Sequence, residues 1–143
     1  MIRRLMFVAL CAVGVLSFAS SGSAVDLDEL KKEVKDGKAV LLDVREEVEW
    51  KKAHLSKAEL VPLSTIATDK HAKSAIEKYT KDPDLKVYTY CRSGRRSVLA
   101  ADMFKRVDAK VIAITQSYQD LVDAGFKETK DTDPKFDPPI DTN

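Results

Sequence analysis

The sequence predicts an α/β fold, with a mainly parallel central sheet flanked by helices on both faces of a single domain. Three observations support this prediction. Apolar runs of strand length at residues 39–44 and 111–114 are typical of strands covered on both faces, and residues 86–90 are rich in aromatic and β-branched side chains. Segments with apolar residues at helical spacing separate these runs. The length of 143 residues suits one domain.

The predicted elements alternate along the chain. Asp26 is expected to cap a first helix that Gly37 closes, and Ser64 is expected to cap a later helix that runs to Tyr79. A turn at Asp82-Pro83-Asp84 follows. The predicted strands are 39–44, 60–61, 86–90 and 111–114, and the predicted helical segments are 26–37, 46–52, 64–79, 97–106 and 118–124.

The first 24 residues have the pattern of a secretory signal peptide. Arg3 and Arg4 precede the apolar run 5–18, and small residues lead to Ala24. The run has about 14 residues, whereas a membrane span needs roughly 20. We therefore expect cleavage after Ala24, no stable membrane insertion afterwards, and export, with the bacterial periplasm as the destination. A retained membrane anchor is the alternative.

The domain prediction follows from these segments. Residues 1–24 are assigned to the signal peptide, 25–126 to the folded domain and 127–143 to an extended or disordered tail rich in aspartate and proline. The whole chain has 24 basic and 23 acidic residues, and cleavage removes two basic ones. This balance argues against a general nucleic-acid binder. The histidines and cysteines lack the spacing of metal ligands, and we expect neither a metal nor a cofactor.

Cys91 is the cysteine that remains after cleavage, because Cys11 leaves with the signal peptide. It follows the strand 86–90 directly and opens a polar loop before a helix expected to begin near Ser97. The helix N-terminus, three arginines and a flexible glycine should together favour the thiolate, which is the nucleophilic form. A buried structural cysteine is the alternative. The loop residues are Arg92, Ser93, Gly94, Arg95 and Arg96.

This loop resembles the active-site loop of the rhodanese superfamily, in which a cysteine is followed by arginine, a small residue and glycine. A second stretch, which begins Leu41-Leu42-Asp43-Val44-Arg45-Glu46, is similar to the N-terminal signature of the same family. The resemblance extends over about residues 38–126. The chain departs from the family pattern at Ala53, at Ser56-Lys57 and at Gln116-Ser117, where glycine or proline-glycine is usual.

The resemblance implies a sulfurtransferase. Cys91 would take sulfur from a small anionic donor such as thiosulfate, hold it as a persulfide, and pass it to a thiol or cyanide. The backbone amides of residues 92–96 would stabilise the persulfide anion. Arg92 and Arg96 are expected to contact the donor, and Arg95 to face solvent.

Three further residues are expected to support the site. Asp43 and Arg45 match the family motif, and we expect them to be structural, with Arg45 paired to Glu49 one helical turn away. Ser97 is expected to cap its helix rather than to contact the sulfur.

Two other functions fit the same residues. A periplasmic persulfide or polysulfide carrier would use the same loop and a sulfur-accepting protein partner. A cysteine-dependent phosphatase or arsenate reductase would use a related fold, but such phosphatases need an arginine six positions after the cysteine. That position is Ser97 here.

Overall fold

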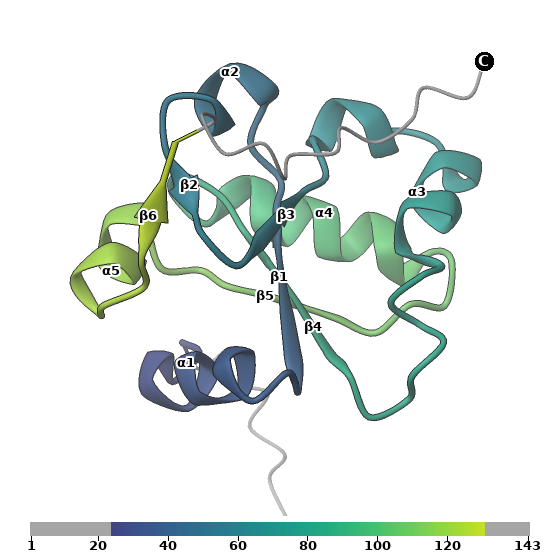
Figure 1. The fold of residues 1–143 in the computed structure, drawn as a ribbon. Helices are drawn as coiled ribbons and strands as arrows, with labels where there is room; N and C mark the ends of the chain where they lie inside the picture. The colour runs from purple at the N-terminus through teal and green to yellow at the C-terminus, as the bar shows by residue number, and fades with distance from the viewer. Residues whose placement is uncertain (1–23, 131–143) are drawn as a thin grey trace, which may run out of the picture.

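A computed structural model describes residues 24–130. The predicted signal peptide, apart from Ala24, and residues 131–143 of the predicted tail lie outside the described part. Figure 1 shows the elements, which in chain order are α1 (Leu27–Lys35), β1 (Ala39–Asp43), α2 (Glu47–Trp50), β2 (His54–Leu55), β3 (Ala58–Leu60), the 3-10 helix η1 (Leu63–Ile66), α3 (Asp69–Ile76), β4 (Lys86–Tyr90), α4 (Arg95–Lys105), β5 (Val111–Ala113), α5 (Tyr118–Asp123) and β6 (Glu128–Thr129).

The central sheet has four strands in the order β3-β1-β4-β5, and all neighbouring pairs are parallel. Each strand of the pair β1 and β4 sends side chains to both faces, because successive residues point in opposite directions. Leu41 packs in a cluster with α1 and α5, whereas Leu42 packs in a second cluster with α3 and α4. Helices therefore lie on both faces of the sheet (Figure 1), and the predicted α/β class is confirmed.

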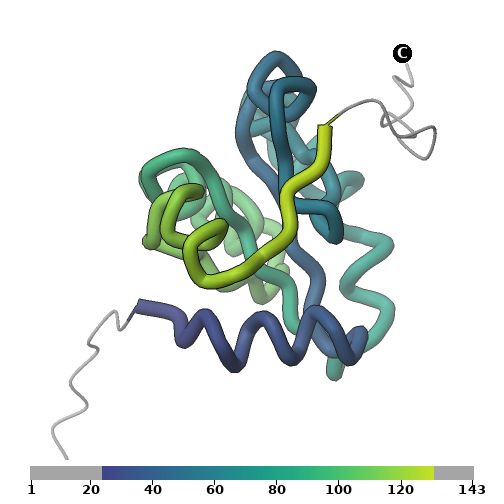
Figure 2. The backbone as a smooth tube through the Cα atoms, turned by 60° about the vertical axis from the view of Figure 1, so that its left-hand side comes forward, coloured from purple at the N-terminus to yellow at the C-terminus, as the bar shows by residue number. Residues whose placement is uncertain are grey.

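A second sheet joins two segments that are far apart in sequence. β2 and β6 are antiparallel, with His54 opposite Thr129, and the amide of Ser56 donates to the carbonyl of Lys127 at 2.8 Å. Figure 2 shows the last described segment, in yellow, running beside the blue segment that contains β2. This pairing fixes the chain directly after the predicted domain boundary at residue 126.

The helix caps agree with the sequence at one position and differ at another. Asp26 caps α1 as predicted, because its carboxylate accepts from the amides of Asp28 and Glu29. Ser64 does not cap α3. It lies inside η1, its hydroxyl donates to Glu46, and the extended Thr68 is the N-cap instead. Among residues 24–130, no helix has the length and apolar character to cross a membrane.

Candidate active site

Cys91 lies at the carboxyl edge of the central sheet. β1 and β4 run parallel in a register that pairs Asp43 with Tyr90, so both strands end at the same level. The amide of Val44 then donates to the carbonyl of Tyr90 at 3.0 Å. Because sites in open parallel sheets form beyond the carboxyl ends of the strands, this edge is the expected place for a reactive group.

The loop after Cys91 is sharply bent. Gly94 has φ of +84°, and α4 begins at Arg95, two residues earlier than predicted. A Cβ on Gly94 would lie 2.2 Å from the carbonyl oxygen of Thr115, so only glycine fits between the loop and the chain after β5. The amide of Tyr118 donates to the carbonyl of Arg92 at 3.1 Å. The loop is thus held against α5 and the segment before it.

The start of α4 supplies unpaired backbone donors beside the loop. The amide of Val98 donates to the carbonyl of Gly94, so the amides before Val98 have no acceptor within the helix. These amides carry the partial positive charge of the helix N-terminus, which favours an anion. Ser93 is exposed at the turn.

The Cys91 side chain is free of any disulfide and fully buried, with 0% of its surface exposed. It belongs to the cluster between the sheet and α4 that includes Val44 and Ala100. Burial of this kind is common for structural cysteines. A reagent from solvent therefore reaches the thiol only when the atoms that cover it move.

Arg96 lies in the first turn of α4, after Cys91, and forms an ion pair with Glu49. Its guanidinium binds the carboxylate of Glu49 through two hydrogen bonds of 2.6 and 2.9 Å. The hydrogen bonds to Glu49 raise the pKa of Arg96, and an attractive interaction with Cys91 contributes to the increase. The same hydrogen bonds lower the pKa of Glu49 from 4.5 to about 2. Both side chains stay charged across the ordinary pH range.

The remaining two arginines of the loop are exposed. Arg92 and Arg95 both face solvent in the resting structure. The two terminal nitrogens of Arg96 are occupied by Glu49. Of the two arginines predicted to contact a donor, Arg92 is therefore exposed, whereas Arg96 is half-buried and bound to Glu49.

Asp43 and Arg45 form a buried ion pair. The carboxylate of Asp43 is 0% exposed and accepts three hydrogen bonds from the Arg45 guanidinium, the shortest 2.6 Å, and one from the Arg45 amide. Burial lowers the pKa of Arg45, but the hydrogen bonds and charge of Asp43 outweigh this effect and raise it. The Arg45 guanidinium also lies 4.2 Å from the ring centre of Tyr118.

The predicted pair between Arg45 and Glu49 is wrong, although the expected structural role of Asp43 and Arg45 agrees with their burial. Asp43 lies two residues from Arg45 at the end of β1, where its carboxylate meets both the backbone and the side chain of Arg45. Glu49 is instead bound by Arg96, which is 47 residues away. No pattern in the sequence indicated this pair, since it depends on how α2 packs beside the loop.

The predicted capping role of Ser97 is also wrong. Because α4 begins at Arg95, Ser97 lies in the first turn rather than before it, and Gly94 occupies the cap position without a side-chain bond. The Ser97 hydroxyl is fully buried and donates to the carbonyl of Thr89 at 2.7 Å. It therefore ties α4 to β4 just ahead of Cys91.

In the described part of the chain, no three His, Cys, Asp or Glu side chains are grouped so that they could hold a metal ion. The arrangement places the Cys91 sulfur just ahead of a helix N-terminus, in a segment with the paired guanidinium of Arg96 and the exposed guanidinium groups of Arg92 and Arg95.

A comparison with protein families matches the model of the rhodanese-like domain over residues 26–127. The chain belongs to this family. The match covers nearly all the described residues, and it contains both the Cys91 loop and the buried Asp43–Arg45 pair.

This rhodanese-like domain is similar to two curated proteins. It is 34% identical over 104 residues to the putative sulfur carrier protein YrkF of Bacillus subtilis, covering 71% of this chain and 52% of that protein. It is 26% identical over 121 residues to the adenylyltransferase and sulfurtransferase MOCS3 of Drosophila ananassae, covering 85% of this chain and 26% of that protein. The chain thus spans about half of the length of YrkF and about a quarter of the length of MOCS3.

Solved structures show the same fold. The rhodanese-like domain of the Alr3790 protein from Anabaena has a TM-score of 0.60 at 17% identity, with coverage of 84% of this chain and 90% of that one. A rhodanese-like domain protein from Staphylococcus aureus has a TM-score of 0.57 at 20% identity, with coverage of 73% and 96%. At these identities the likeness establishes the fold.

Proposed function

We propose that this chain is a sulfurtransferase in which Cys91 carries sulfur as a persulfide. Family membership and the names of the two curated relatives support sulfur transfer in general. The observation that carries the proposal for this chain is the position of Cys91, which lies at the carboxyl end of β4 and just ahead of the N-terminus of α4. Thiosulfate or a similar small dianion is the proposed donor.

The proposed reaction has two displacements at sulfur. The Cys91 thiolate attacks the outer sulfur of thiosulfate, the sulfur–sulfur bond of the donor breaks, and sulfite leaves with the electron pair. A persulfide anion remains on Cys91. A thiol or cyanide then attacks the terminal sulfur, and the Cys91 thiolate leaves and is regenerated. The amides at the start of α4 and the Arg96 charge would stabilise the anion in both forms.

Burial of the thiol adds a condition on how the donor enters. The resting side chain is 0% exposed, whereas the Arg92 and Arg95 side chains in the same loop are exposed. We infer that these side chains attract the dianion and that the atoms covering Cys91 move aside as it approaches. A small reagent such as methyl methanethiosulfonate should therefore modify Cys91 much faster than the bulky disulfide DTNB. Equal rates with both reagents would contradict this.

The proposal places the activity outside the cytoplasm, because the predicted signal peptide would export the chain. An exported thiol lacks the reducing systems that keep cytosolic cysteines reduced, and the persulfide state suits such a compartment. Fractionation of the source cells, with an antibody against the folded domain, tests this part separately.

Mass spectrometry tests the sulfur chemistry directly. The protein used is the segment of residues 25–143, which contains every helix and strand described above. Cys91 is the one cysteine in this segment. After exposure to thiosulfate, the intact mass should increase by one sulfur atom, and cyanide should remove that atom. The Cys91→Ser variant should gain nothing. A gain of equal size in this variant, or no gain in the unmodified protein, would refute the role of Cys91.

A carrier that acts with a partner protein is the second candidate, and the 34% identity to a protein named as a putative sulfur carrier favours it. Both candidates predict the loaded form of Cys91. They differ in the second step, since an enzyme passes its sulfur rapidly to cyanide, whereas a carrier discharges slowly until its partner is added. Faster hydrolysis of an aryl phosphate than conversion of thiosulfate and cyanide to thiocyanate would contradict both.

A further inference from the structure

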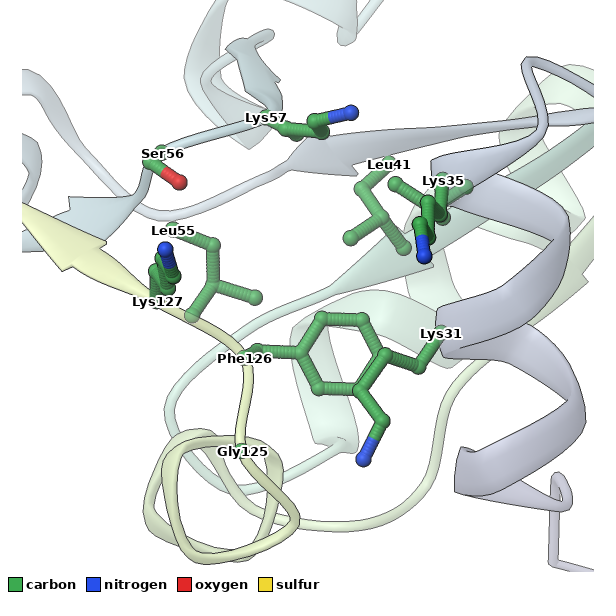
Figure 3. A pocket seen from close by; sticks show the side chains of 10 residues that line it. Lys31, Lys35, Leu41, Leu55, Ser56, Lys57, Gly125, Phe126 and Lys127 are labelled. Atoms are coloured by element: carbon green, nitrogen blue, oxygen red, sulfur yellow. The ribbon is translucent and has the colours of Figure 1, made fainter.

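A cavity of about 170 Å³ lies on the side of the sheet that α1 covers. It is bounded by α1, by the turn between β2 and β3, and by the segment from Gly125 to Lys127 that leads into β6 (Figure 3). These three segments meet because β6 pairs with β2 and because the Lys31 ammonium donates to the carbonyl of Ala124 at 2.6 Å. The cavity walls are therefore held together by one strand pairing and one side-chain hydrogen bond.

The floor of the cavity is apolar. Val34, Leu41, Leu55 and Phe126 line it, and each of these residues is at most 9% exposed. Figure 3 shows the Phe126 ring between the Leu41 and Lys31 side chains. An apolar cavity of about 150 Å³ accommodates benzene. A cavity of this size therefore suits an aliphatic or aromatic body of about six carbon atoms.

The rim of the cavity is positively charged. Four lysines line it and no acidic residue does, although the whole chain has almost equal numbers of basic and acidic residues. Lys31 is paired with Asp28. Within residues 24–130, no carboxylate lies within ion-pair distance of the other three lysines, which are Lys35, Lys57 and Lys127.

The ammonium groups are placed where an anionic head would sit. In Figure 3 the Lys35 side chain points towards Phe126, and the Lys127 side chain lies beside Leu55. A ligand with an apolar body would bury that body on the floor and leave its charge among these groups. An apolar ligand alone would gain nothing from the ammonium groups, and a small inorganic anion would gain nothing from the apolar floor.

We propose that this cavity binds a small organic anion, a carboxylate or sulfonate with a short aliphatic or aromatic body. The site is separate from the proposed sulfur chemistry. Leu41 and Leu55 belong to the cluster with α1 and α5, whereas Cys91 belongs to the cluster on the opposite face of the sheet. Binding of an anion in this cavity therefore does not require a persulfide on Cys91.

Hexanoate is a suitable probe, because its body has the expected size. Titration of labelled protein, residues 25–143, should shift the backbone amide signals of Ser56, Gly125 and Lys127 to saturation, with a Kd on the order of 0.1–1 mM. Hexanol, which lacks the charge, and acetate, which lacks the body, should each bind at least fivefold more weakly. Addition of salt should weaken hexanoate binding.

A pair of double variants tests the rim. Lys35→Gln with Lys127→Gln should weaken hexanoate binding at least fivefold, and both residues are exposed, so the fold should be kept. The matched control, Lys70→Gln with Lys81→Gln, removes two exposed lysines that do not line the cavity and should leave binding unchanged. Shifts that do not saturate, equal binding of hexanol, or equal losses in both variants would overturn the proposal.

Discussion

Replacing Gly94 with alanine should destabilise the fold and displace the loop that follows Cys91. The φ of +84° costs a residue with a side chain about 1–2 kcal/mol. The new Cβ would also lie 2.2 Å from the Thr115 carbonyl oxygen. Cβ atoms in proteins essentially never lie closer than 3.0 Å to such an atom, so the backbone of the loop or of Thr115 would have to shift. Since the obstacle is backbone, no change of rotamer relieves it, and overpacking of this kind costs about 1–3 kcal/mol. The expected total is about 2–5 kcal/mol.

Gly37→Ala is the matched control for this prediction. Gly37 has a similar φ of +72°, but nothing lies within 4 Å of the position where a Cβ would stand. Gly37→Ala should therefore lower the free energy of unfolding only by the cost of the positive φ, about 1–2 kcal/mol. Urea unfolding of both variants, at an unchanged m-value, measures the difference. Sulfur loading of Cys91 should fall in Gly94→Ala and stay normal in Gly37→Ala. Equal losses of stability would refute the argument from the Thr115 contact.

Two further predictions concern the ion pairs near the site. Asp43→Asn should lower the free energy of unfolding by about 3–5 kcal/mol, because Arg45 stays buried without a negative partner. The control is Asp28→Asn, which removes an exposed carboxylate and should cost less than about 1 kcal/mol in the same urea assay. The pKa of Glu49 is lowered from 4.5 to about 2. Its carboxylate therefore stabilises the fold fully at pH values above 4.5, and this contribution is lost as the pH falls through about 2. The stability difference between the unmodified protein and Glu49→Gln should therefore be constant near neutral pH and shrink in acid, and a difference that does not change with pH would contradict the assigned pair with Arg96.

The sequence was sufficient for features that depend on local pattern. The apolar run at 39–44 became β1, the run at 86–90 became β4, and the carboxylate of Asp26 caps α1 as expected. These succeed because strand burial and helix capping are governed by residues that are close together in the chain. The position of Cys91 at the end of a buried strand follows from the same reasoning.

The start of α4 shows where local pattern was not enough. Ser97 looked like a cap because serine favours that position, yet the helix begins at Arg95. The Ser97 hydroxyl is instead buried in the core, where it donates a hydrogen bond to the carbonyl of Thr89. The bend at Gly94 depends on the Thr115 carbonyl, which comes from another part of the chain.

By itself, the sequence determined the fold class, the strand that delivers Cys91 and the loop of basic residues after it. Only the tertiary structure decided that Glu49 binds Arg96, that the thiol is covered at rest, and that lysines from three segments surround one apolar cavity. The physical reason is separation along the chain. Ion pairs, burial and cavities arise from packing between distant segments, and a single sequence carries no local signal for such contacts.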